Sequence, residues 1–113
     1  MLSRLADLER EYDAVLARLA DPATLADPAR LRTESKRHRE LEPIVMRYRE
    51  HVACSAEAAE ARDALMSSEG EEREVWRALA EESEARREQL EGELRELLLP
   101  KDPNDDRDVI VEI

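Results

Sequence analysis

The stretch SSEGE at positions 67–71 separates two long helical runs and decides the fold. Ser68 and Glu71 have the spacing of a capping box, in which each side chain bonds to the other residue's backbone N–H. Residues 28–66 before this stretch and 69–99 after it are rich in Ala, Glu, Leu and Arg, which are strong helix formers. Two long helices joined by so short a turn lie antiparallel, so the sequence predicts a helical hairpin.

Residues 2–20 form a third amphipathic segment upstream of the hairpin. Its apolar residues recur at steps of three and four, the spacing of one helix face: Leu5, Leu8, Tyr12, Val15, Leu16 and Leu19. The segment 21–28 lacks this pattern and contains two Asp-Pro pairs, so the first helix should end by Asp21. Asp27 and Pro28 suit the N-cap and the first position of the next helix.

The helix predicted over residues 28–66 contains a proline. Pro43 removes one hydrogen bond of the helix and crowds the preceding turn. The apolar stripe continues in phase past it, so the sequence predicts a kink rather than a break. The predicted stripe comprises Leu31, Ser35, His38, Leu41, Val45, Tyr48, Val52, Ala56, Ala59 and Leu65.

The helix predicted over residues 69–99 has an apolar beginning and end and a polar middle. Its predicted buried side comprises Val75, Trp76, Leu79, Leu90, Leu94, Leu97 and Leu98. Residues 81–89 are polar apart from Ala85, so we expect this part to be thinly packed or solvated.

Beyond residue 99 the composition changes. Residues 100–106 have the composition of a loop, and VIVEI at 109–113 predicts a β-strand that has no partner in this chain. The predicted fold class is therefore all-α, an antiparallel helical hairpin or three-helix bundle with long helices. We predict a helical domain over 1–99, followed over 100–113 by a linker and the first strand of a truncated next domain.

The composition of the chain excludes several classes of protein. The 113 residues carry a net charge of −11, 3% aromatic residues and one cysteine. No apolar run is long enough to span a membrane, and no secretory signal is visible. A single cysteine cannot form an internal disulfide, which suits the cytosol. The acidic balance argues against charge-driven binding of nucleic acid by the whole chain.

Charge is nevertheless unevenly distributed along the chain. Residues 30–39 have a local charge of +4, whereas residues 69–99 contain eleven Glu and five Arg. We favour the interpretation that the basic residues form a solvated face that pairs with the 69–99 helix. The alternative is contact with RNA phosphates. The candidate contact residues are Arg30, Arg32, Lys36, Arg37 and Arg39.

The remaining chemically active side chains have structural interpretations. His38 and His51 lack metal-ligand spacing and are expected to be packed or half-exposed. We expect Cys54 to be a buried, inert thiol and Trp76 to pack against the neighbouring helix. The carboxylates lie on predicted exposed faces or in loops, and no phosphate loop, nucleophile elbow or metal motif is present. We therefore predict no catalytic residue, no metal, no cofactor and no enzymatic activity.

Several segments resemble bacterial peptide chain release factor one, a class I translation release factor family. LLLPKDPND at 97–105, followed by VIVEI at 109–113, closely resembles the junction between that family's N-terminal helical domain and its central decoding domain. LEPIV at 41–45 with YRE at 48–50 resembles its second helix, and RLADLE at 4–9 resembles its first. The resemblance covers the whole chain, and the run at 97–105 is its specific part.

The resemblance implies a role in translation termination. The family answers the stop codons UAA and UAG and triggers hydrolysis of peptidyl-tRNA, using a Pro-x-Thr tripeptide and a Gly-Gly-Gln loop. Neither motif occurs in this sequence, so no codon-reading or catalytic residue is carried over. The implied partners are ribosomal RNA and protein near the GTPase-associated region of the large subunit, and the class II release factor GTPase. No membrane and no small-molecule substrate is implied, and the expected location is the cytoplasm.

A different class of function remains open from the residues alone. The chain could be a stand-alone acidic coiled-coil adaptor or a dimeric scaffold. The polar middle of the 69–99 helix interrupts a strict heptad, which weakens this alternative. The predicted strand at 109–113 also has no use in a scaffold.

Overall fold

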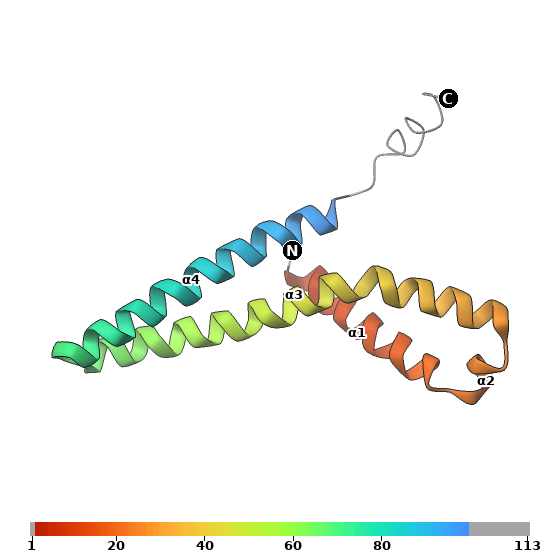
Figure 1. Ribbon diagram of the computed structural model, residues 1–113, viewed down its shortest axis with the longest axis horizontal. Helices are drawn as coiled ribbons and strands as arrows, with labels where there is room; N and C mark the ends of the chain where they lie inside the picture. The colour runs from red at the N-terminus through yellow and green to blue at the C-terminus, as the bar shows by residue number, and fades with distance from the viewer. Residues whose placement is uncertain (1, 100–113) are drawn as a thin grey trace, which may run out of the picture.

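A computed structural model describes residues 2–99 of the protein, and this part of the chain is helical (Figure 1). The helices are α1 (Leu2–Leu19), α2 (Pro22–Leu25), α3 (Pro28–Ser67) and α4 (Gly70–Leu98). The three long helices confirm the all-α prediction. The predicted linker and strand at 100–113 lie outside the described residues. None of the helices within 2–99 combines the length and the apolar character needed to cross a bilayer.

Asp-Pro pairs start two of the helices. The Asp27 carboxylate accepts hydrogen bonds from the backbone N–H groups of Ala29 and Arg30, at 3.2 and 3.3 Å, and Pro28 occupies the first turn. This confirms the predicted cap. Asp21 acts in the same way on the N–H of Ala23 at 3.0 Å, which starts the single-turn helix α2. Helix α2 was not predicted, because one turn is too short to show a period in the sequence.

Helix α3 is shared by two successive hairpins. Helix α1 packs antiparallel to its first half and α4 packs antiparallel to its second half, on opposite sides in Figure 1. Helices α1 and α4 make no close backbone approach to each other within residues 2–99. The predicted antiparallel hairpin is therefore present, and the long helices do not surround one common core.

The main apolar core lies between α1 and the first half of α3. It consists of Tyr12, Val15, Leu41 and Val45, with Leu8 and Leu19 packed against it. The Tyr12 ring also stacks on the imidazole of His38, with ring centroids 5.2 Å apart. These residues belong to the apolar stripes predicted for both helices, because the stripe of α1 packs directly against the stripe of α3.

The predicted stripe of α3 is wrong from Val52 to Ala59, although Leu65 near its end is half-buried. The residues that α3 buries beyond Tyr48 are His51, Cys54, Ala58 and Ala61, whereas Val52, Ala56 and Ala59 are exposed. At roughly 100° per residue, this face is almost opposite the face of Leu41 and Val45. The physical reason is the change of partner, because α4 lies on the other side of α3 from α1.

The predicted buried side of α4 is also wrong in part. Leu90 and Leu94 are fully buried as predicted, but Val75 is 65% exposed and Leu97 is 39% exposed. Ala80 and Ser83 are buried instead, and Ala85 is exposed. The polar middle is therefore packed against α3, since alanine and serine allow two helices to approach closely.

The turn between α3 and α4 does not contain the predicted capping box. The Ser68 hydroxyl donates a 2.6 Å hydrogen bond back to the Ala64 carbonyl. Glu69 occupies the N-cap of α4 without a side-chain cap bond. Gly70 has a φ of +62°, in the left-handed region that glycine enters without a steric cost. The reversal therefore depends on Gly70 rather than on a Ser68–Glu71 exchange.

Helix α3 continues through Pro43, as predicted. The Arg47 guanidinium donates a 3.0 Å hydrogen bond to the Pro43 carbonyl, one turn earlier. Figure 1 shows that α3 is bent between its two halves. A bend of this kind is the usual consequence of a proline inside a helix.

Candidate functional site

The residues of the predicted basic cluster lie on different faces of the first three turns of α3. Arg32, Lys36 and Arg39 recur at steps of four and three, so they share one exposed face. Together with Leu31 and Ser35 they line a shallow hollow of about 470 Å³. Three cations on one face, beside two small or apolar side chains, provide a surface suited to an anionic partner.

Arg37 does not belong to this face. Its Nη2 donates a 2.7 Å hydrogen bond to Oε1 of Glu11 on α1, and the guanidinium also lies 3.9 Å from Glu40. The hydrogen bond from Arg37 lowers the pKa of Glu11, and the same bond raises the pKa of Arg37. We expected the basic residues to pair with the 69–99 helix, and Arg37 instead pairs with α1.

The other members of the cluster have no such partner. Arg30 lies in the first turn of α3 and is exposed, like Arg32, Lys36 and Arg39. None of these four side chains forms an ion pair with another residue in the range 2–99. The charge of the exposed face is therefore not neutralised by the part of the fold that the structure describes.

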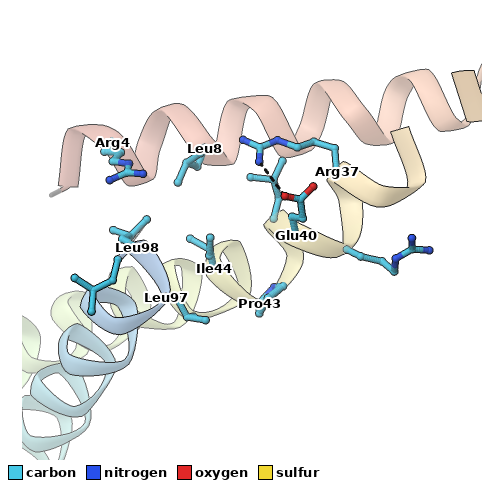
Figure 2. A pocket seen from close by; sticks show the side chains of 11 residues that line it. Arg4, Leu8, Arg37, Glu40, Pro43, Ile44, Leu97 and Leu98 are labelled. Carbon is cyan, nitrogen blue, oxygen red and sulfur yellow. Dashed lines mark ion pairs between the residues drawn. The ribbon is translucent and has the colours of Figure 1, made fainter. Parts of the chain in front are cut away.

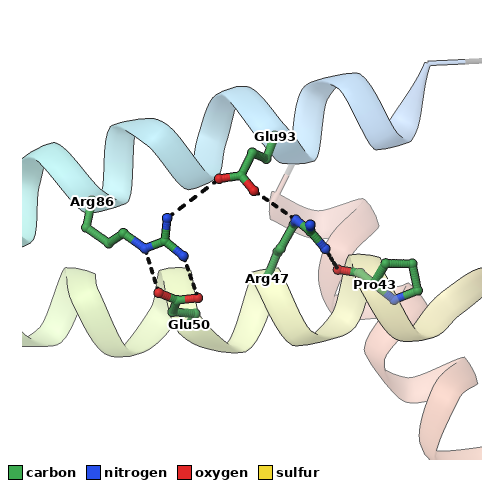
Figure 3. A network of polar contacts seen from close by, with 5 residues as sticks. All are labelled: Pro43, Arg47, Glu50, Arg86 and Glu93. Atoms are coloured by element: carbon green, nitrogen blue, oxygen red, sulfur yellow. Dashed lines mark hydrogen bonds and ion pairs between the residues drawn. The ribbon is translucent and has the colours of Figure 1, made fainter.

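The acidic side chains of α4 pair with a different part of α3 (Figure 3). Arg47 Nε lies 3.0 Å from Glu93 Oε1. Arg86 holds both oxygens of Glu50, at 2.6 and 2.9 Å, and its Nη1 lies 3.7 Å from the other oxygen of Glu93. Opposite charges therefore face each other across the α3–α4 hairpin. The prediction that the basic residues at 30–39 pair with the 69–99 helix is wrong, because α4 packs against the second half of α3.

Both histidines are packed, as predicted. His51 is 6% exposed, and its Nε2 lies 3.0 Å from Oε1 of Glu91. The hydrogen bond with His51 lowers the pKa of Glu91. His38 is half-buried against Tyr12, with its Nε2 3.5 Å from Glu42. No group of three or more potential metal ligands occurs among the described residues.

Cys54 and Trp76 also occupy structural positions. Cys54 is 8% exposed, and burial raises the pKa of its thiol. This agrees with the predicted inert thiol, because the thiolate is the reactive form. Trp76 is half-buried on α4.

A second hollow lies where α1, α3 and the end of α4 meet (Figure 2). Its volume is about 410 Å³. Leu8 of α1, Ile44 of α3 and Leu98 of α4 point into it, and Arg4 stands at its edge. No sequence pattern predicts this hollow, because its residues come from three helices and have no common period.

Comparison with known proteins places the chain in a family. Residues 8–113 match the PCRF domain. The chain is 42% identical over its whole length to peptide chain release factor 1 of Alkaliphilus oremlandii. It is 40% identical to that of Acidobacterium capsulatum and 41% identical to that of Geobacter sulfurreducens, again over its whole length. No solved structure matches the chain.

The chain spans about a third of the length of these curated relatives, 31–32% in the three named. The aligned third is their N-terminal part. With nearly all of its residues matching the PCRF domain, and with about 40% identity to bacterial release factors along its full length, this chain belongs to the PCRF domain family.

Proposed function

We propose that this chain is the N-terminal docking domain of a class I peptide chain release factor, which terminates translation at UAA and UAG in the cytoplasm. The observation that carries the proposal is the identity of about 40% to release factor 1 over the whole chain. In this proposal the chain itself supplies no catalytic group. Codon reading and hydrolysis of peptidyl-tRNA depend on the parts of the relatives that this chain does not match.

The geometry supports a docking role. Helix α3 has 40 residues, so at ~1.5 Å per residue it is a rod of roughly 60 Å. One end of this rod presents the exposed face of Arg32, Lys36 and Arg39. The proposed partner of this face is the phosphate backbone and protein of the large ribosomal subunit near its GTPase-associated region. The class II release factor GTPase is a further proposed partner of the arm.

The basic face can be tested by removing charges that form no ion pair within residues 2–99. We suggest the double substitution Arg32→Gln/Lys36→Gln in the full-length factor. If both side chains contact phosphates, ribosome affinity should fall, and the magnitude of the negative slope of log K against log salt should decrease by roughly 1.4–1.8. The measurement is equilibrium binding to ribosomes carrying a stop codon, at several salt concentrations.

The matched control is Arg10→Gln/Arg77→Gln. Both of these arginines are exposed and pair only with an acidic residue one turn away on their own helix, namely Asp7 and Glu74. The control removes the same charge from other surfaces, so its salt slope should stay near that of the wild type. Equal slopes for the test variant, the control and the wild type would exclude the basic face as a phosphate contact.

A further inference from the structure

The end of α4 is surrounded by surface that no described residue covers. The hollow of about 410 Å³ at the junction includes Leu97, Leu98 and Leu99 in its wall. An adjoining hollow of about 390 Å³ is lined by Arg4, Arg95, Leu98 and Leu99. The two hollows share three of these residues, so they form one continuous concave surface around the point where the chain leaves α4.

This surface combines apolar side chains with charged ones, since Arg4, Arg37 and Arg39 line it together with Glu40, whose carboxylate lies 3.9 Å from Arg37. Its floor is formed by Leu8, Ile44 and Leu98 (Figure 2). Arg4 and Arg39 stand at its edge, and neither forms an ion pair within residues 2–99. Such a surface suits a peptide that carries both carboxylates and compact apolar groups.

We propose that residues 100–108 of this same chain fold back onto the junction hollow and dock there. This stretch, PKDPNDDRD, contains four aspartates against one lysine and one arginine. Its carboxylates complement Arg4 and Arg39, and Pro100 and Pro103 supply compact apolar faces for the leucine floor. Docking would fix the direction in which the following part of the polypeptide leaves the helical arm.

The covalent connection favours this occupant over a separate molecule. Leu99 lies in the wall of the hollow and is 67% exposed. Residue 100 is covalently bonded to Leu99, so the segment begins beside the hollow, and any chain can span at most ~3.3–3.6 Å per residue. A tethered segment has an effective concentration of the order of millimolar, which a second copy or a free partner seldom reaches.

The proposal can be tested by paramagnetic relaxation in the 113-residue chain. The spin label is placed at Asn104→Cys on a Cys54→Ala background, so that no charge of the segment is removed. We expect the label to at least halve the methyl signals of Leu8 and Ile44. Val75 is the internal reference, because it lies near the far end of the hairpin and is exposed. Raising the salt to 1 M, where the Debye length is ~3 Å, should restore the signals.

Charge variants separate specific docking from chance proximity. Arg4→Gln should weaken the broadening at Leu8 and Ile44, whereas Arg10→Gln, an exposed arginine on the same helix, should leave it unchanged. Absence of broadening in the parent chain would overturn the proposal, as would equal effects of the two variants. Broadening that passes from labelled to unlabelled chains in a mixed sample would assign the hollow to a second copy instead. None of these outcomes depends on ribosome binding, so the proposed function is tested separately.

Discussion

Nε2 of His51 lies 3.0 Å from Oε1 of Glu91, and this contact marks the face that α3 turns toward α4. His51 is 6% exposed, while its neighbour Val52 is 49% exposed. A polar residue is therefore inside the hairpin and a β-branched apolar residue is outside it. Hydrogen bonding makes this arrangement stable, because a buried polar group costs little free energy when it has a partner.

The first prediction concerns the buried polar residue His51 and its exposed apolar neighbour Val52. We expect His51→Ala to lower the free energy of unfolding by about 1–3 kcal/mol, since it leaves a gap in the seam and removes the hydrogen-bond partner of Glu91 Oε1. We expect Val52→Ala to change it by no more than about 0.5 kcal/mol. Urea denaturation followed by circular dichroism measures both. A larger loss for Val52→Ala than for His51→Ala would mean that α3 is rotated relative to the structure.

The second prediction compares the stability effects of substituting Arg37 and Arg39, which lie two positions apart. Arg37→Glu places a carboxylate opposite Glu11 and Glu40, so we expect the free energy of unfolding to fall. The loss should be about 0.5–1 kcal/mol, because both side chains of the Arg37–Glu11 pair are more than one third exposed and solvent screens them. Arg39→Glu should have an effect within about 0.5 kcal/mol.

The charge-swapped double variant Glu11→Arg/Arg37→Glu provides the control for this pair. If the two side chains interact as described, the second substitution should recover most of the stability that Arg37→Glu loses. No recovery would show that Arg37 acts through other contacts. Ribosome-binding tests should accordingly avoid Arg37, since its loss is expected to lower the stability of the fold as well as change the surface charge.

The third prediction concerns the dependence of stability on pH. Four glutamates have a pKa lowered by a hydrogen bond from a basic side chain on the facing helix: Glu11, Glu50, Glu84 and Glu91. A carboxylate with a lower pKa in the folded state stabilises the fold fully above its unfolded pKa of ~4.3. That stability is lost as the pH falls through the lower folded values.

Thermal unfolding of the wild type and of Glu11→Gln between pH 7 and pH 3 measures this effect. The two Tm values should differ most near neutral pH and approach each other as the pH falls through the lowered pKa of Glu11. The comparison is needed because protonation of other carboxylates relieves repulsion in a chain of net charge −11. A difference in Tm that is constant with pH would contradict the lowered pKa of Glu11.

The ends of the helices were predictable because their signals are local. Asp27 and Pro28 start α3 through contacts within one turn. An Asp-Pro pair can make these contacts wherever a helix begins, so they can be read from the sequence. The bounds of α3 and α4 agree with the predictions to within one residue. Gly70 was part of the predicted boundary, but its positive φ was not inferred.

The faces of the helices were less predictable, because they depend on which helix packs where. Leu41 and Val45 were assigned correctly, since with Tyr48 they keep the spacing of four and three that marks one helix face. Beyond Tyr48, alanines occur all around α3, so Ala56 and Ala58 are equivalent by composition. Only the position of α4 decides that Ala58 is buried and Ala56 is exposed.

The five basic residues of the candidate site were predicted, but which of them share one surface was not. Sequence proximity grouped Arg37 with Arg39, although the two differ by roughly 200° around the helix axis. The pairing of Arg37 with Glu11 spans 26 positions of sequence, and no local pattern announces it. Counting positions around the helix would have separated Arg37 from Arg32, Lys36 and Arg39 before the structure was known.

The last prediction concerns the thiol of Cys54. Burial and the nearby Glu50 and Glu57 raise its pKa, and the side chain is 8% exposed, so little reactive thiolate should meet a reagent. We expect Ellman's reagent to react at pH 8 roughly 100-fold more slowly than in urea, as a local opening of about 2.7 kcal/mol would give. The matched control is Met66→Cys on a Cys54→Ala background, since Met66 is 85% exposed. The thiol of this control should react equally fast with and without urea. If Cys54 of the folded wild type reacts as fast as the control thiol, the seam between α3 and α4 is open in solution.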